Sequence, residues 1–371
     1  MFTLTDLGDL PGGTNQSWAN GLNNLGHVTG ASMAVTATAA DLGWRPYVWT
    51  PASGMKRLTA PSGLGIGAGG TGINDADVIV GFNGCICDPV TPYAGWTWAG
   101  NTATGAGTVT STTGSVDVTR GINDSGQVAG WNVIGSYANP ATQTAQAYRY
   151  NPGTPATATN LGHLVGGTTS SAWAINNQGH VVGAAASAIG QQPYLYTDAG
   201  GMQALTPTAR GTAFGINDAD EVVGQLLAAN GTANGQAFLW SAAQGLQTLG
   251  TANWRAEDIN NHGWVVGCVW ASGSCVNRNG SAGLLWIPGD GLHNLLDLID
   301  PQDPLKPGLV INNAPGVNDH GQIVINARRN GIQHAYLLTP VVPQVPEPPS
   351  MVLLGMGMLA LAELRRRGAA G

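Results

Sequence analysis

The chain has 371 residues, including 56 glycines and 12 tryptophans, and only 9% of them are charged, against about a quarter in typical soluble domains. A hydrophobic content of 43% predicts a buried core, so the composition excludes an ordinary helical enzyme and a disordered chain. The net charge of −7 argues against a nucleic-acid partner.

The first predicted element is a strand over residues 2–7 (FTLTDL), which has no copy elsewhere in the chain. A ten-residue motif follows and occurs seven times, as in GINDSGQVAG from Gly121. Asn and Asp favour turns, and the flanking Ile and Val favour strands. The lead asparagines of the seven copies are Asn23, Asn74, Asn123, Asn176, Asn217, Asn260 and Asn318.

Each motif is followed by an aromatic and aliphatic segment, such as QAFLW from Gln236, and then by a segment after a Gly turn, such as GLQTLG from Gly245. One repeat therefore predicts four short strands in 40 to 50 residues, which is the size of a propeller blade. We predict an all-β, seven-bladed β-propeller of four-stranded blades over residues 1–340. A solenoid or two smaller sandwiches are the alternatives.

The last repeat lacks a fourth strand, whereas residues 2–7 are a surplus strand at the other end of the chain. We expect the N-terminal strand to complete the last blade from the outside and so close the ring. The Ile-Asn strand is then innermost, and the Asn-Asp turns surround one mouth of the central channel.

The second turn residues would form a polar ring at that mouth, which could bind a cation or a sugar, although turn chemistry alone explains the same residues. The members of this axial ring are Asn24, Asp75, Asp124, Asn177, Asp218, Asn261 and Asp319. Two Asp-x-Asp pairs, Asp75 with Asp77 and Asp218 with Asp220, suggest calcium but lack the Glu that ends a calcium loop. We predict no metal, no cofactor and no catalytic residues.

Cysteines and tryptophans are the remaining candidates for special roles. The four cysteines fall in two pairs, and we predict a disulfide between Cys268 and Cys275, which would close a hairpin loop. Four tryptophans occupy less regular places than the others and are candidate surface platforms for sugars: Trp18, Trp44, Trp254 and Trp270.

The C-terminus is divided into a Pro-rich linker (341–349), a hydrophobic helix (350–364) and a basic tail (365–371). The uncharged run from Pro348 to Ala362 would span about 22 Å as a helix, less than a free-standing membrane span needs. It predicts a marginal membrane anchor. Its cytoplasmic end is marked by Arg365, Arg366 and Arg367.

Two resemblances follow from these residues. HAYLL from His334, QAFLW and the GIND motifs resemble the HAF repeats of bacterial extracellular proteins, over nearly all of residues 1–340. The tail resembles a PEP-CTERM sorting signal, with a Pro-Glu-Pro motif, a hydrophobic helix and an Arg cluster. This resemblance implies export, and an exosortase-type membrane protease-transpeptidase that reads Pro346, Glu347 and Pro348.

The N-terminus disagrees with export, because residues 1–6 have neither a basic region nor an apolar run. We expect a mature or truncated start, or a start codon placed too late; otherwise export does not occur. The function we predict is an exported, non-enzymatic cell-surface or matrix protein that binds exopolysaccharide. The alternative is a glycan-active hydrolase or lyase at the axial mouth, which would need titratable residues in irregular positions near the axis.

Overall fold

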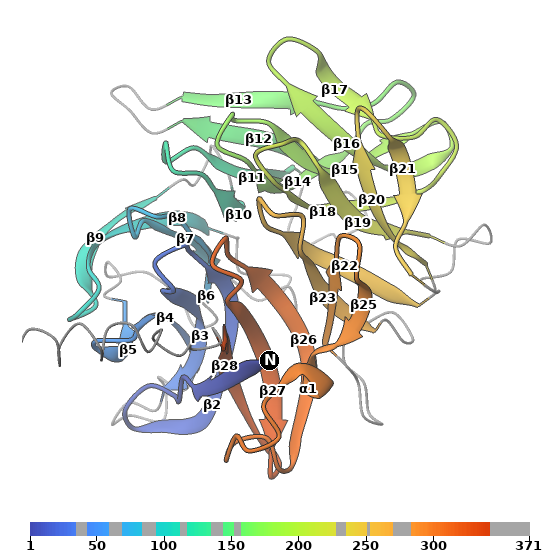
Figure 1. Cartoon of the computed structure of the whole chain (residues 1–371). Helices are drawn as coiled ribbons and strands as arrows, with labels where there is room; N and C mark the ends of the chain where they lie inside the picture. The colour runs from blue at the N-terminus through green and yellow to red at the C-terminus, as the bar shows by residue number, and fades with distance from the viewer. Residues whose placement is uncertain are drawn as a thin grey trace, which may run out of the picture. The chain divides into compact units, whose positions relative to one another are not determined.

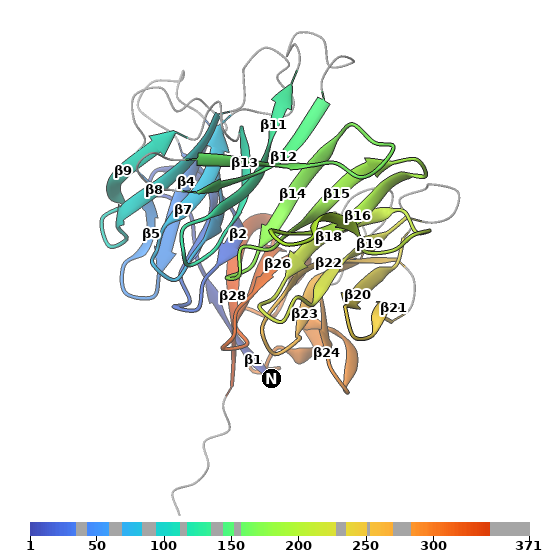
Figure 2. The same cartoon turned by 90° about the horizontal axis from the view of Figure 1, so that it is seen from above.

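The computed structural model describes residues 1–34, 43–58, 69–83, 94–111, 117–134, 144–151, 157–227, 235–250, 253–269 and 283–341. Seven four-stranded antiparallel sheets surround a central axis (Figures 1 and 2), which confirms the predicted seven-bladed propeller. Met1–Pro340 form one compact unit and Val341–Gly371 a second. The predicted hydrophobic helix and basic tail lie outside the described residues, among which no helix is long and apolar enough to cross a membrane.

The first four blades follow the repeats in chain order, with the innermost strand first. Blade 1 contains β2 (Gly13–Leu22), β3 (Val28–Ala34), β4 (Gly43–Thr50) and β5 (Gly54–Arg57). Blade 2 contains β6 (Gly69–Ile73), β7 (Ile79–Asn83), β8 (Ala94–Asn101) and β9 (Ala106–Ser111). Blade 3 contains β10 (Val118–Ile122), β11 (Val128–Ile134), β12 (Thr144–Asn151) and β13 (Thr157–Gly162). Blade 4 contains β14 (Ser170–Ile175), β15 (Val181–Ser187), β16 (Gly190–Thr197) and β17 (Gly201–Ala204).

The remaining blades complete the ring. Blade 5 contains β18 (Gly211–Ile216), β19 (Val222–Leu226), β20 (Ala237–Ser241) and β21 (Gly245–Thr248). Blade 6 contains β22 (Trp254–Ile259), β23 (Val265–Val269), β24 (Gly283–Ile287) and β25 (Gly291–Asn294). Blade 7 contains β26 (Leu309–Val317), β27 (Ile323–Arg329), β28 (Ile332–Pro340) and, outermost, β1 (Phe2–Asp6).

The N-terminal strand closes the ring as predicted. β1 pairs antiparallel with β28, with Phe2 opposite Pro340 and Asp6 opposite Tyr336. A one-turn helix that was not predicted, α1 (Leu295–Leu298), precedes a segment that supports β1, since Asp303 accepts a hydrogen bond of 2.7 Å from the Leu4 N–H. The edge that an open array would leave is therefore paired.

The hydrophobic core lies between blades, because one sheet cannot bury both of its faces alone. Val182 of blade 4, for example, packs in one cluster with Ile216, Val222 and Phe238 of blade 5. Trp254 is 1% exposed and belongs to such a layer, so its assignment as a surface platform was wrong.

Six of the seven turn motifs end in a glycine, and the seventh ends in Ile325. In blade 5 this glycine is required by close packing within the blade. A Cβ atom on Gly224 would lie 2.1 Å from the backbone oxygen of Thr212 in the innermost strand. That strand carries a β-bulge between Ala213 and Gly215, which brings the two backbones close together. This close approach explains why six of the seven copies keep a residue without a side chain at this position.

Candidate functional site: the axial mouth

The lead asparagines of the seven motifs join the blades in a closed circle. The Nδ2 atom of each donates to the backbone oxygen of the lead asparagine in the next blade, over 2.9 to 3.1 Å, and Asn318 closes the circle on Asn23. The Oδ1 atom of each accepts backbone N–H groups of its own turn; for Asn217 these belong to Ala219 and Glu221. All seven side chains are buried, so they act as structural links.

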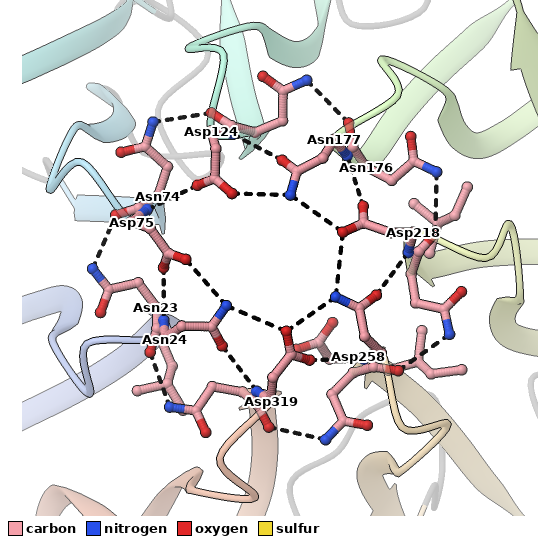
Figure 3. A pocket seen from close by; sticks show the side chains of 18 of the residues that line it. Asn23, Asn24, Asn74, Asp75, Asp124, Asn176, Asn177, Asp218, Asp258 and Asp319 are labelled. Carbon is pink, nitrogen blue, oxygen red and sulfur yellow. Dashed lines mark hydrogen bonds between the residues drawn. The ribbon is translucent and has the colours of Figure 1, made fainter.

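The predicted axial ring lies inside this circle. Oδ1 of each member accepts the backbone N–H of the member in the preceding blade, over 2.8 to 3.0 Å, until Asp319 donates to Asn24 (Figure 3). The seven side chains surround a cavity of about 190 Å³ at one channel mouth. Their hydrogen bonds serve the fold, and a ligand at the ring stays a prediction.

Amides and carboxylates alternate around the axial ring as far as an odd number allows. The Nδ2 atoms of Asn24, Asn177 and Asn261 each bridge two neighbouring carboxylates, over 2.9 to 3.3 Å. Seven positions cannot alternate completely, and the two like neighbours are Asp75 and Asp124. Four carboxylates and three neutral amides leave this mouth negatively charged.

The Asp-x-Asp pairs link blades. Asp77 and Asp220 adopt φ values of 59° and 58°, at the turn position where the other five copies have glycine. The Asp220 carboxylate accepts from Nδ2 of Asn176 and lies 2.8 Å from Nδ1 of His180, both in the preceding blade. Across the described ranges, no three His, Cys, Asp or Glu side chains are arranged to hold a metal ion.

One carboxyl group beside the axial ring breaks the repeat. Asp258 stands where the other motifs begin with Gly or Ala, and it lines the same cavity (Figure 3). Burial raises its pKa to about 6, against the lowering effect of the Val317 N–H, which donates to Oδ2 over 3.0 Å. Sequence reasoning missed this residue, although its departure from a repeating background was the signal.

The other predicted site residues cannot be placed together. Cys268 is buried in β23 and disulfide-bonded, but Cys275 is not among the described residues, so their pairing stays a prediction. Pro346, Glu347 and Pro348 also lie outside the described part of the chain, as does the arginine cluster 365–367.

Comparisons with known proteins identify the tail and the fold. Residues 344–367 match the PEP-CTERM protein-sorting motif, which implies export and processing by an exosortase. No curated protein matches the chain.

Among solved structures, an acylaminoacyl peptidase in complex with Z-Gly-Gly-Phe-chloromethyl ketone is similar, with a TM-score of 0.53 and 11% identity over 92% of this chain. The Pyrococcus horikoshii acylaminoacyl peptidase gives a TM-score of 0.49 and 10% identity over 87% of the chain. The chain spans 54% and 51% of these two proteins. At 11% identity, the likeness to the first shows a shared fold alone.

Proposed function

We propose that the chain is an exported, non-enzymatic cell-surface or matrix protein whose propeller binds extracellular polysaccharide. The observation that carries the proposal is the sorting motif at residues 344–367. In this proposal the exosortase reads Pro346, Glu347 and Pro348, the segment 350–364 anchors the chain before processing, and the arginines 365–367 stay in the cytoplasm.

The propeller supports a binding role because its frame is closed and its axial mouth is polar. Two circles of hydrogen bonds and a paired terminal strand fix the seven turns relative to one another. A pre-organised polar surface of this kind loses little entropy when it binds a sugar. The HAF-repeat resemblance, which is also part of the proposal, points to the same extracellular setting.

The sorting half is tested by changing the motif in cells that contain an exosortase. We expect Glu347→Ala and Pro346→Ala to leave the full-length chain in the membrane fraction, whereas wild type is shortened near the motif. Pro343→Ala is the matched control, because Pro343 precedes the matched residues. Intact mass spectrometry of the propeller reports the outcome, and normal shortening of the Glu347 and Pro346 variants would contradict the proposal.

The glycan-active enzyme remains a second candidate because of Asp258. A carboxyl group with a pKa near 6 suits a general acid, and Glu257 supplies a neighbouring carboxylate. A release assay for reducing ends on acidic and neutral polysaccharides tests this candidate. Release of sugar by wild type that Asp258→Asn abolishes would establish it, and no release would favour the binding protein.

A further inference from the structure

Each innermost strand carries a β-bulge just before its turn motif opens. In blades 1 to 6 the pairing with the second strand skips one residue there, and a bulge leaves that residue unpaired and re-aims its side chain. The skipped residues are Asn20, Thr71, Arg120, Trp173, Phe214 and Glu257. These side chains differ although their surroundings repeat, so the ring loses its symmetry at this level.

The bulge residues of blades 3 to 6 converge in a chain of aromatic and charged groups. The Arg120 guanidinium carbon lies 4.5 Å from the ring centroid of Trp173 and 5.4 Å from that of Trp131. The rings of Trp173 and Phe214 meet edge to face, with their centroids 5.1 Å apart. The guanidinium carbon of Arg255 lies 4.7 Å from the ring centroid of Phe214. Apart from Trp131 in β11, these side chains come from the innermost strands of four consecutive blades, so we expect the cluster to face the channel.

The guanidinium of Arg120 makes no direct ion pair or hydrogen bond among the described residues, although the charge of Glu257 acts on it, and its Nε atom is buried without a partner. The other two arginines stacked on aromatic rings are paired: Arg149 binds the Asp198 carboxylate, and Arg255 binds Glu257. Burial and the nearby Arg255 lower the pKa of Arg120 to about 10, against Glu257, so it stays charged at neutral pH.

An unpaired buried cation is costly, and such a position is commonly completed by an anion. Asn20 and Thr71, the bulge residues of blades 1 and 2, show the structural alternative, because each donates to a backbone oxygen of the next blade. Arg120 makes no such link. The rings of Trp131, Trp173 and Phe214 keep part of their surface exposed, so the cluster is accessible to a ligand.

The axial ring and the Arg120 cluster lie at different depths of the channel. Arg120 precedes Asn123 by three residues, which corresponds to about 10 Å along an extended strand. The four carboxylates of the axial ring repel an anion at their mouth. We therefore expect a negatively charged ligand to reach Arg120 from the opposite end of the channel.

We propose that Arg120, together with Trp131, Trp173 and Phe214, binds a carboxylate-bearing sugar residue of an extracellular polysaccharide. The planar guanidinium matches a carboxylate with two parallel hydrogen bonds, and the aromatic faces pack against the apolar face of a pyranose ring. A hexuronate presents both features in one residue. This inference rests on the proposed polysaccharide-binding function and names its class of sugar.

The test is a titration of the purified full-length chain with oligogalacturonate, followed by calorimetry and tryptophan fluorescence at 0.15 M salt. We expect saturable binding with a change in fluorescence, because the ligand contacts tryptophan rings. The methyl ester of the same oligosaccharide keeps the ring and removes the charge, so it should bind at least about tenfold more weakly. Equal binding of the ester would overturn the proposal.

Variants locate the site. Arg120→Gln should weaken binding of the acidic oligosaccharide about 10- to 100-fold, and Arg120→Lys should weaken it less because it keeps the charge but loses the planar fork. Arg328→Gln, which removes an exposed arginine from blade 7, is the matched control and should bind as wild type. Thermal melting establishes that each variant is folded, and unchanged binding by folded Arg120→Gln would refute the site.

The outcomes separate this site from the broader function. Binding of neutral polysaccharide without any preference for the acidic form would keep the polysaccharide-binding proposal and remove the Arg120 site. Absence of binding to acidic and neutral oligosaccharides alike would contradict both.

Discussion

Replacing one lead asparagine should destabilise the whole propeller. Asn217→Ala removes the bond from Nδ2 to the Asn260 backbone oxygen (3.1 Å) and the bond from Nδ2 to the Glu221 carboxylate (2.8 Å). It also removes the acceptor of the Ala219 and Glu221 N–H groups. The change therefore weakens both the turn and the link from blade 5 to blade 6.

The size of the loss in the free energy of unfolding depends on the burial of Asn217. Asn217 is 4% exposed, so the backbone groups that lose their partner are poorly placed to bind water instead. At about 1 kcal/mol for each of three backbone hydrogen bonds, the free energy of unfolding should fall by about 3 kcal/mol. For a chain of this size, that loss lowers the melting temperature by about 4 °C.

A matched control shows whether the loss of stability requires a buried hydrogen bond between blades or whether an exposed one has the same effect. Gln178 also donates to a backbone oxygen of the next blade, that of Asp218, over 2.6 Å, but its side chain is exposed. Gln178→Ala should cost less than about 0.5 kcal/mol. Urea unfolding of both variants measures the difference, and equal stabilities would refute the claim that the buried circle holds the blades together.

Three further outcomes are expected. Asp258→Asn should raise the free energy of unfolding by about 1 to 2 kcal/mol at pH 7.5 and leave it unchanged below pH 4. The reason is that the pKa of Asp258 is about 6 in the folded state against an ordinary 3.8, so its charge makes stability fall as pH rises through this window. Urea unfolding at both pH values measures the effect, and a gain of equal size at both would contradict it. His334→Gln should lower the free energy of unfolding by about 0.5 to 1 kcal/mol at pH 5.5 and by little at pH 8.5. The hydrogen bond with Asp6 raises the pKa of His334, so the stabilisation is complete below the ordinary pKa and is lost as pH rises through the folded pKa. A pH-independent cost would count against this pair. Deleting residues 1–7 should lower the melting temperature and promote self-association through the exposed edge of β28, as measured by thermal melting and sedimentation. A monomer with the stability of wild type would show that closure by β1 is unimportant.

The sequence predicted the frame of the molecule because its signals are local. The Asn-Asp motif marks a turn, and seven copies of a repeat with up to four strand-like segments define seven blades. The surplus strand at residues 2–7 and the missing strand of blade 7 also predicted how the ring closes. Each of these inferences needs only residues that are close in sequence, or a simple count.

The contacts between blades could not be predicted in the same way. Asn176 donates to the backbone of Asn217, 41 residues on, and this partner becomes evident only when the blades surround an axis. The contact between Arg120 and Trp173 depends on two bulges in neighbouring blades. The signal for Asp258 was its departure from the Gly or Ala of the other copies. Arg120 stands at a position that differs in each of blades 1 to 6, so the repeat gave no such signal for it.

The central claim is that the C-terminal motif delivers this propeller to the cell exterior. It is tested most directly by measuring the mass and the location of the protein in cells with and without the exosortase. We expect a protein shortened near Pro346 and accessible to external protease when the enzyme is present, and an unshortened protein retained in the membrane when it is absent. The same mass and location in both cells would contradict the account.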